Sequence, residues 1–531
     1  MYQFEGTNPI IYSDYPDADV IRVNDTYYMV STTMHFMPGC VILKSYDLIH
    51  WATCSYCYDR LDSTPGQQLK DGKGIYGKGM WAATIRYHEG MFYICFVAND
   101  TGKTYIFRSE NIEGPWRKNV IEGSFFHDSS ILFDDDGRVY VAYGNRNIYI
   151  TELNEDLTAV KEGGLHRLAV TDENKVWLGY EGSHLYKING KYYIFFIHWP
   201  ENSMRTEACF VADSIDGEFK GSDVLCSDLD DMHSGTAQGG IVDTPDGDWY
   251  GIVFQDHGAV GRIPVLVPVT WKDGFPVFGE NGVTPKKVTV SLKDSEKAER
   301  FLAEYTPEEA LYASDSFDYA PDRDGAVRLK KVWQWNHEPD DALWSVTEKP
   351  GKLSLTGGKL SPNLVQAVNT LTQRTYGKHC AAEVTVDADE INEGDYAGLC
   401  ALQGSYGFIA VTKKNGKFCL TVMKKKETER RPGMGSFDAE PGQVVAEIEG
   451  ASRVTFRMEC DFSKDKDTVR FLYTTKTGNI MPEDFVRLGD EKKMFFSLDH
   501  FTGCRFGLFY FPTMTTGGKA YFENFEYFVL D

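Results

Sequence analysis

The sequence lacks the long apolar segments that mark membrane proteins. No stretch approaches the roughly 18 consecutive apolar residues that a membrane helix needs. The opening residues, MYQFEGTNPIIYSDYPD, contain neither the basic segment nor the apolar segment of a secretory signal. We therefore expect no membrane partner and a cytoplasmic location.

The cysteines lack the paired spacing of a disulfide framework. There are 11, an odd number, scattered from Cys40 to Cys504. Reduced thiols in a cytosolic protein are the simplest interpretation. Cys54 and Cys57 form the one close pair, and without a second pair they are weak evidence for zinc.

Positive charge is also in short supply. The chain has 55 Lys and Arg residues against 78 Asp and Glu residues, which gives a net charge of −23 over 531 residues. So acidic a chain repels phosphate backbones and anionic lipids. We expect no nucleic-acid partner and favour neutral or cationic ligands.

Long helical periodicity is scarce, whereas aromatic residues (14%) and glycines (50) are plentiful, as in β-proteins. A polar turn followed by two aromatic or apolar residues and an apolar run occurs five times. In every copy the second of the two residues is a tyrosine, and these are Tyr28, Tyr93, Tyr140, Tyr193 and Tyr250. Their successive spacings are 65, 47, 53 and 57 positions. The repeat predicts an all-β fold with a five-bladed β-propeller. An irregular β-sandwich with repeated hairpins is the alternative.

The repeat stops near residue 290, which suggests a domain boundary. Residues 291–312 are charged and irregular, as expected of a linker. Alternating runs such as 352–356 and 380–386 then predict a second all-β domain, a lectin-like β-sandwich. We thus predict a propeller over 1–290, a linker over 291–312 and a sandwich over 313–531.

Three acidic residues stand immediately before predicted strands of different blades: Asp17, Asp128 and Glu181. Positions at which blades begin converge on the central channel of a propeller. Glycoside hydrolysis needs such a set, because one carboxylate must activate water while another carboxylic acid protonates the leaving group. The competing interpretation is that these three are solvated like most of the 78 acidic residues.

The segments around these residues resemble glycoside hydrolase family 43. Asn8-Pro9-Ile10-Ile11 with Tyr15-Pro16-Asp17, then Phe126-His127-Asp128-Ser129-Ser130, and then Glu181-Gly182-Ser183-His184 are similar to its three motifs in order. The resemblance implies that Asp17 is the general base, Glu181 the general acid, and Asp128 the group that tunes the acid and orients the sugar. It also implies an inverting mechanism.

The resemblance continues beyond the propeller. Residues 333–337 and 369–374 are similar to the β-sandwich of the family's β-xylosidase and α-L-arabinofuranosidase branch. By the same resemblance we expect five substrate-binding residues, namely Trp81, Phe36, Arg262, His257 and Phe501. Trp81 has the alternative of packing in a blade core. His257 either supports Arg262 or merely packs. Arg205 could reach the rim of the channel.

Two positions depart from the family pattern. Ala18 stands where a proline usually follows the base, and Gln238 stands where a histidine is usual. Some relatives place a divalent ion near that histidine. The resemblance thus implies a structural calcium near Gln238, although a neutral amide is a weak sole ligand. We expect the chemistry itself to require no cofactor.

We expect an exo-acting glycosidase that releases terminal β-D-xylose, α-L-arabinofuranose or both from xylo-oligosaccharides or arabinose-containing oligosaccharides. A dedicated α-L-arabinofuranosidase is the nearest alternative, since both sugars present similar hydroxyls. A non-catalytic carbohydrate-binding protein is the alternative from another class. A sandwich domain of this kind is also compatible with a homo-oligomer.

Overall fold

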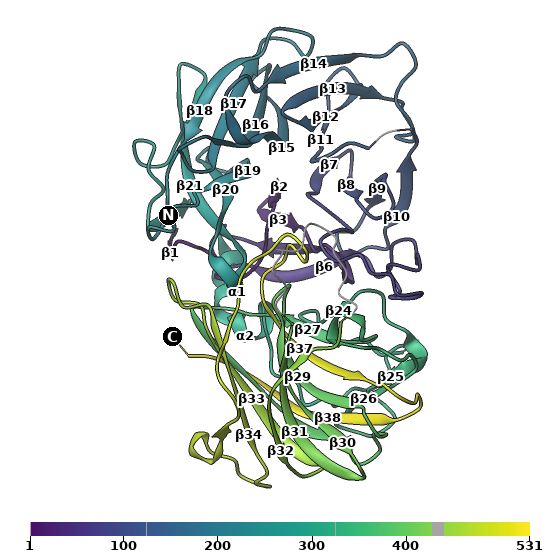
Figure 1. The fold of residues 1–531 in the computed structure, drawn as a ribbon. Coiled ribbons are helices and arrows are strands. Elements are labelled where there is room, and N and C mark those ends of the chain that lie inside the picture. The colour runs from purple at the N-terminus through teal and green to yellow at the C-terminus, as the bar shows by residue number, and fades with distance from the viewer. Residues whose placement is uncertain (1, 124, 324, 427–439, 531) are drawn as a thin grey trace.

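The computed structural model describes residues 2–123, 125–323, 325–426 and 440–530 (Figure 1). Across these residues, five four-stranded antiparallel sheets come first and two larger sheets follow. The prediction of an all-β chain, a five-bladed β-propeller followed by a β-sandwich, is confirmed.

Each blade is built from strands that follow one another in the chain. The first blade contains β2 (Asp19–Val23), β3 (Thr26–Ser31), β5 (Gly39–Ser45) and β6 (Ala52–Tyr58). The second contains β7 (Thr84–His88), β8 (Met91–Ala98), β9 (Lys103–Ser109) and β10 (Arg117–Ile121). The third contains β11 (Ser130–Phe133), β12 (Val139–Asn145), β13 (Asn147–Leu153) and β14 (His166–Thr171).

The last two blades repeat this order. The fourth contains β15 (Val176–Ile188), β16 (Lys191–Pro200), β17 (Thr206–Ala212) and β18 (Lys220–Leu225). The fifth contains β19 (Ala237–Asp243), β20 (Trp249–Asp256), β21 (Arg262–Lys272) and β22 (Phe275–Phe278). The first strands of the blades, β2, β7, β11, β15 and β19, contact one another in a ring. This ring defines the central channel, and the five repeated tyrosines all fall on the second strands.

The propeller is tied to the sandwich by a short helical segment. β1 (Tyr2–Thr7) pairs with β23 (Lys287–Leu292) in a two-stranded sheet, so the first and last strands of the propeller region lie side by side. The segment predicted as an irregular linker then contains α1 (Glu296–Glu304) and α2 (Pro307–Ala310). α1 forms because its charged residues face water while Ala298 is buried, an amphipathic arrangement.

The sandwich consists of two facing antiparallel sheets. One contains β24 (Gln334–Asn336), β27 (Leu371–Arg374), β29 (Tyr396–Leu402), β30 (Gly407–Lys414), β31 (Lys417–Lys424), β32 (Gln443–Glu449) and β37 (Arg505–Phe511). The other contains β25 (Trp344–Ser345), β26 (Leu353–Thr356), β28 (His379–Asp387), β33 (Arg453–Asp461), β34 (Thr468–Thr474), β35 (Val486–Arg487), β36 (Lys492–Lys493) and β38 (Lys519–Val529). Short 3-10 helices occur at Gly258–Val260, Asp341–Leu343, Leu364–Gln366 and Pro482–Asp484.

The two domains share a strand pairing. β4 (Phe36–Met37), a two-residue strand within the first blade's connections, pairs with β24 of the sandwich, with Met37 opposite Trp335 and Phe36 opposite Asn336. A single cluster of buried apolar side chains extends from the propeller into the sandwich. The domains therefore fold against each other over a continuous core, one above the other in Figure 1.

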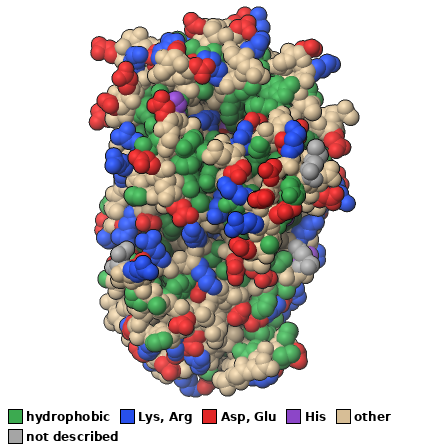
Figure 2. Space-filling model, turned by 180° about the vertical axis from the view of Figure 1, so that it is seen from behind, with side chains coloured by type: hydrophobic (Ala, Val, Ile, Leu, Met, Phe, Trp, Pro, Cys, Tyr) green, Lys and Arg blue, Asp and Glu red, His purple; other side chains and the backbone are tan. Residues whose placement is uncertain are grey.

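The surface carries charges of both signs. Figure 2 shows acidic and basic side chains interspersed over the face seen there, rather than gathered into one patch. None of the helices in the described residues is both long and apolar enough to cross a bilayer.

Candidate active site

A cavity of about 450 Å³ opens where the inner strands of the propeller begin. Asp17, Asp128 and Glu181 all line it, although they are far apart in the sequence. Asp17 and Asp128 immediately precede β2 and β11, and Glu181 lies within β15. The structure therefore brings together the three carboxylic side chains that the sequence singled out.

The backbone at this site is unusual. Asp17, Asp128, Gln238 and Phe501 have φ angles of 55°, 48°, 59° and 57°, in the left-handed region that side-chain-bearing residues seldom adopt. Such conformations cluster at functional sites because the surrounding structure holds them there. Gly182 has a φ of 65°, and a Cβ on it would lie 2.5 Å from Cγ of Gln238. Only glycine therefore fits next to Glu181.

Asp17 is buried and held by two donors. Nη1 of Arg262 donates to its Oδ1 at 2.8 Å, and Nε2 of Gln238 donates to the same oxygen at 3.2 Å. Burial raises the pKa of Asp17, Arg262 opposes that rise, and the negative charge of Asp128 adds to it. The ion pair with Arg262 is thus what favours the ionised form of this buried carboxyl group.

Glu181 and Asp128 are held by a different set of partners. Nε2 of His127 lies 3.3 Å from Oε2 of Glu181 and 3.7 Å from Oδ2 of Asp128. Burial lowers the pKa of His127, but the charges of Asp128 and Glu181 outweigh burial and raise it to about 9. Nδ2 of Asn145 also donates to Oε2 of Glu181.

Asp128 occupies the more enclosed position of this pair. Burial raises its pKa, the imidazolium of His127 opposes the rise, and the negative charge of Glu181 adds to it. The backbone N–H of Gly182 donates to Oδ2 of Asp128 at 3.2 Å. The charge of Glu181 therefore acts directly on the carboxyl group of Asp128.

Aromatic side chains from both domains wall the cavity. The ring of Trp81 lies 5.8 Å from that of His127 and 6.0 Å from that of Phe501. Phe501 comes from the loop before β37 of the sandwich, and the guanidinium carbon of Arg262 lies 4.5 Å from its ring centre. The structure thus places Trp81, Arg262 and Phe501 at the cavity, as the family resemblance implied.

Asp14 fastens the sandwich loop to the propeller. Its Oδ1 accepts from the backbone N–H of Arg262 at 2.9 Å, and its Oδ2 accepts from the backbone N–H of Gly503 at 2.8 Å. One buried carboxylate therefore fixes both the partner of Asp17 and the loop that carries Phe501.

Two predicted substrate residues, Phe36 and His257, are not among the residues that line the cavity. Phe36 is 1% exposed and lies at the domain junction, where the guanidinium carbon of Arg505 is 3.6 Å from its ring centre. His257 is also buried, with Nε2 3.1 Å from Oε1 of Gln255, and burial lowers its pKa to about 4. In both cases the side chain is buried against neighbouring residues, and a sequence motif alone does not reveal such packing.

Sequence reasoning missed several residues of the cavity. Asn145 is a neutral residue at the end of β12 without a distinctive spacing. Trp177 is 71% exposed at the cavity and stands four positions before Glu181 on β15, but the register of β15 shifts between the two, so the spacing alone did not predict a shared face. Arg205, considered only as a rim residue, lines the cavity, with its guanidinium carbon 4.9 Å from the ring centre of Trp199 and an ion pair to Asp256.

The side chains around Gln238 do not suit calcium. Its amide donates to Asp17, and its backbone N–H donates to Oε2 of Glu207 at 2.6 Å. Burial raises the pKa of Glu207 well above its usual range, which favours the neutral acid, a poor calcium ligand. Within the described residues, the one group of three side chains with metal-binding atoms close together is His127, Asp128 and Glu181. A pKa of about 9 favours the imidazolium form of His127 when no metal is bound, and a metal would have to displace that proton to use the imidazole as a ligand.

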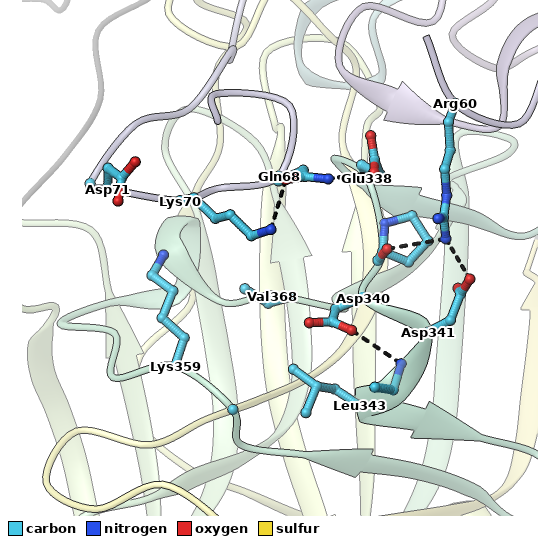
Figure 3. Close-up of a pocket in the computed structure, with 14 residues that line it drawn as sticks. Arg60, Gln68, Lys70, Asp71, Glu338, Asp340, Asp341, Leu343, Lys359 and Val368 are labelled. Carbon is cyan, nitrogen blue, oxygen red and sulfur yellow. Dashed lines mark hydrogen bonds and ion pairs between the residues drawn. The ribbon is translucent and has the colours of Figure 1, made fainter. Parts of the chain in front are cut away.

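A second, larger cavity of about 710 Å³ lies between the domains (Figure 3). Nη2 of Arg60 lies 2.6 Å from Oδ2 of Asp341, and Nε2 of Gln68 donates to Oε1 of Glu338 at 2.8 Å. Among the described residues that line it, none is aromatic. This cavity offers neither a stacking surface nor a set of converging carboxylates.

Separately held carboxylic groups facing one aromatic-walled cavity are what glycoside hydrolysis requires, and on a five-bladed propeller they define a glycoside hydrolase. The sequence model described as "Glycosyl hydrolases family 43" matches residues 6–276. A second, described as "Beta xylosidase C-terminal Concanavalin A-like domain", matches residues 325–528. The chain belongs to glycosyl hydrolases family 43, and the resemblance seen in its motifs is confirmed.

Individual relatives agree with this membership. A beta-xylosidase of Formosa agariphila is 27% identical over 80% of this chain and 78% of its own length. A non-reducing end alpha-L-arabinofuranosidase of Bacteroides ovatus is 26% identical over 78% of each.

Solved structures show the same two-domain arrangement. A bifunctional GH43-CE protein of Bacteroides eggerthii is 40% identical, with a TM-score of 0.87 over 99% of this chain, which spans 64% of that protein's length. A GH43 glycoside hydrolase engineered to display endo-xylanase and exo-arabinofuranosidase activity is 26% identical, with a TM-score of 0.86 over 99% of this chain and 100% of its own.

Proposed function

We propose that this glycoside hydrolase is exo-acting and releases terminal β-D-xylose, α-L-arabinofuranose or both from xylo-oligosaccharides or arabinose-containing oligosaccharides. The observation that carries the proposal is the division of the cavity's acidic groups between two sets of partners. Asp17 is paired with Arg262, whereas Glu181 is clustered with Asp128 and His127. A base and an acid need such separate environments.

Asp17 acts as the general base in this proposal. The ion pair with Arg262 favours its carboxylate, which takes a proton from a water molecule as that water attacks the anomeric carbon. Glu181 acts as the general acid and gives its proton to the glycosidic oxygen as the bond to the leaving group breaks. Asp128 interacts with Glu181 by charge and binds a sugar hydroxyl.

Donors without protein partners support binding of a hydroxyl-rich ligand. Nε and Nη2 of Arg262 and Nε1 of Trp81 are buried, and none of them has a hydrogen-bond partner within the described residues. Buried donors normally find partners, so sugar hydroxyls would satisfy groups that the folded chain leaves unpaired. The faces of Trp81 and Phe501 suit the C–H surfaces of a sugar ring.

The exo mode rests on the wall that the sandwich contributes. Phe501 stands on the sandwich side of a cavity whose other walls come from the propeller. A cavity walled from two domains accepts a chain end more readily than the middle of a polymer. The names of the relatives include both a beta-xylosidase and an alpha-L-arabinofuranosidase, which favours activity on both sugars over a dedicated α-L-arabinofuranosidase.

We also propose a cytoplasmic location and a chemistry that needs no cofactor. All 11 cysteines are free thiols, and ten of them are at least partly buried. That usage suits a reducing compartment.

The test is turnover of nitrophenyl β-D-xyloside and nitrophenyl α-L-arabinofuranoside, with the anomeric configuration of the first product followed by NMR. We expect release from both substrates and inversion at the anomeric carbon, which requires carboxyl groups roughly 6.5–9.5 Å apart. Retention of configuration would contradict the roles of Asp17 and Glu181. Binding without turnover on either sugar would favour a non-catalytic carbohydrate-binding protein.

A further inference from the structure

The inner strands of the propeller hold a largely buried cation, Arg86. The side chain of Arg86, on β7, is 11% exposed, and its Nη1 donates to Oδ2 of Asp19 at 2.7 Å. Its Nη2 donates to Oγ of Ser130 at 2.7 Å and to the backbone carbonyl of Leu185 at 3.3 Å. The guanidinium therefore joins inner strands of four different blades.

Asp19 completes the arrangement as a fully buried counter-ion. Its Oδ2 also accepts from Oγ1 of Thr84 at 2.9 Å and from the backbone N–H of Ile85 at 2.8 Å, and its Oδ1 lies 3.1 Å from Nδ1 of His184. Burial raises the pKa of Asp19, but Arg86 and His184 outweigh burial and bring the pKa below its usual range. Asp19 and Arg86 are thus a buried ion pair with its remaining bonding positions largely filled.

The fifth blade is connected through Tyr186. The guanidinium carbon of Arg86 lies 5.0 Å from the ring centre of Tyr186, whose hydroxyl oxygen accepts from the backbone N–H of Ile241 on β19. A Cβ on Gly240 would lie 2.3 Å from that hydroxyl oxygen and 2.9 Å from Oδ1 of Asp19. The network therefore reaches all five inner strands.

The residues that bind Arg86 lie close to the reacting groups in sequence. Asp19 and Ser130 are two residues beyond Asp17 and Asp128, and Leu185 is four residues beyond Glu181. Arg86 thus binds each of the three strands β2, β11 and β15, at a residue two to four positions beyond the carboxylic group. Movement of the guanidinium would alter the relative positions of Asp17, Asp128 and Glu181 together.

We infer that Arg86 is a positioning residue, and that its guanidinium supplies the fixed positive charge that the family resemblance assigns to a divalent ion near Gln238. The side chains around Gln238 do not suit calcium, whereas Arg86 supplies a permanent cation with donors aimed at fixed acceptors. The catalytic consequence rests on the proposed function.

The first experiment measures the metal dependence of the wild-type chain. Thermal unfolding and turnover of nitrophenyl β-D-xyloside and nitrophenyl α-L-arabinofuranoside are followed after treatment with EDTA and after addition of calcium chloride. We expect the same unfolding temperature and turnover in both. Inactivation or destabilisation by EDTA that calcium reverses would overturn the inference. The unfolding temperature tests metal dependence even if neither sugar is turned over. A failure of the proposed function can therefore be told apart from a failure of this inference.

The second experiment compares Arg86→Met and Arg86→Lys with Arg22→Met. Arg22 is the matched control, because it also links two blades through an aspartate, Asp243, but contacts none of the strand ends that carry the carboxylic groups. We expect Arg86→Met to lose about 100-fold in kcat with little change in KM, since misplaced reacting groups slow the chemical step. Arg86→Lys should lose less, and Arg22→Met should keep kcat within about threefold.

Two readouts separate positioning from general stability. Loss of the cation leaves Asp19 as an unbalanced negative charge, so the acid limb of kcat/KM in Arg86→Met should move to higher pH, while Arg86→Lys stays near wild type. Added guanidinium ion should restore part of the kcat of Arg86→Met, and it should not raise the kcat of Arg22→Met. If Arg86→Met does not fold, Arg86→Lys and the EDTA measurement decide. A kcat within threefold of wild type in Arg86→Met with an unmoved acid limb would overturn the inference. Where only Arg86→Lys folds, a kcat within threefold of wild type would overturn it.

Discussion

The two cavities of the molecule differ in what their polar groups are bound to. The larger, between the domains, is lined by polar groups that bind one another, such as Arg60 with Asp341 and Gln68 with Glu338, and among its described lining residues only Oε2 of Glu338 is buried without a partner (Figure 3). The smaller, at the propeller channel, contains interacting carboxylic groups and donors of Arg262 and Trp81 without protein partners. Volume therefore does not identify the site, whereas unsatisfied and mutually repelling groups do.

The strongest test of this contrast replaces one carboxylate in each cavity. Asp17→Asn should lower kcat/KM by about 10³-fold or more on every substrate, because no other group at that place activates water. Asp340→Asn, in the cavity between the domains, should stay within about twofold. Steady-state kinetics on both nitrophenyl glycosides measure the two. Comparable losses in the two variants would remove the distinction between the cavities.

Glu181→Gln sharpens the contrast by its dependence on the leaving group. A general acid contributes about 10²–10⁴-fold, and only poor leaving groups need the proton. We expect a loss in that range on xylobiose and roughly tenfold or less on a dinitrophenyl xyloside. Glu338 is the matched carboxylate of the other cavity. Glu338→Gln should therefore turn over both substrates at the wild-type rate. Equal losses on both substrates in Glu181→Gln would count against its role as acid.

Phe501→Ala tests the contribution of the sandwich to the site. Loss of an aromatic wall costs about 1 kcal/mol beyond its buried area, which corresponds to about fivefold in kcat/KM. We expect most of the change in KM. Phe495 is a phenylalanine of the same loop region that does not line the cavity, so Phe495→Ala serves as the control. An unchanged KM in Phe501→Ala would mean that the sandwich does not wall the site.

The smallest expected effect concerns stability and pH. The pKa of His127 rises from an ordinary 6.5 to about 9 in the folded chain, because Asp128 and Glu181 outweigh its burial. The folded state therefore binds this proton more tightly, and the resulting stabilisation is complete below about pH 6.5 and lost as pH rises through about 9. Between these values the melting temperature of wild type should fall more steeply than that of His127→Gln. His88→Gln, at a half-exposed histidine, should follow wild type; parallel curves for all three would contradict the assignment.

The repeat and the three carboxylates were predictable because each has a local signal. Tyrosines at similar positions in five turn-and-strand units mark second strands, and Asp17, Asp128 and Glu181 each stand where an inner strand begins or bends. These features depend on neighbours in sequence, which a pattern can show.

Other parts depended on contacts between distant residues. Phe36 resembled a pocket residue, yet pairing of β4 with β24 turns it into the domain junction, and a two-residue strand has no periodicity to reveal it. Asn145 and Trp177 reach the cavity because β12 and β15 bring them there, and nothing in their immediate sequence separates them from other asparagines and tryptophans. α1 escaped prediction because nine residues contain too little periodicity among so many charges.

The pairing of β4 with β24 also bears on how the chain is made. Met37 and Trp335, which face each other in that pairing, are 298 residues apart. At about 5–20 residues per second, roughly 15–60 s pass on the ribosome between the emergence of the two. β4 of the propeller therefore remains without its pairing partner β24 for that time. The loop with Phe501 emerges later still. A nascent propeller therefore emerges from the ribosome before Phe501 does, and the wall that the sandwich contributes to the cavity is added last.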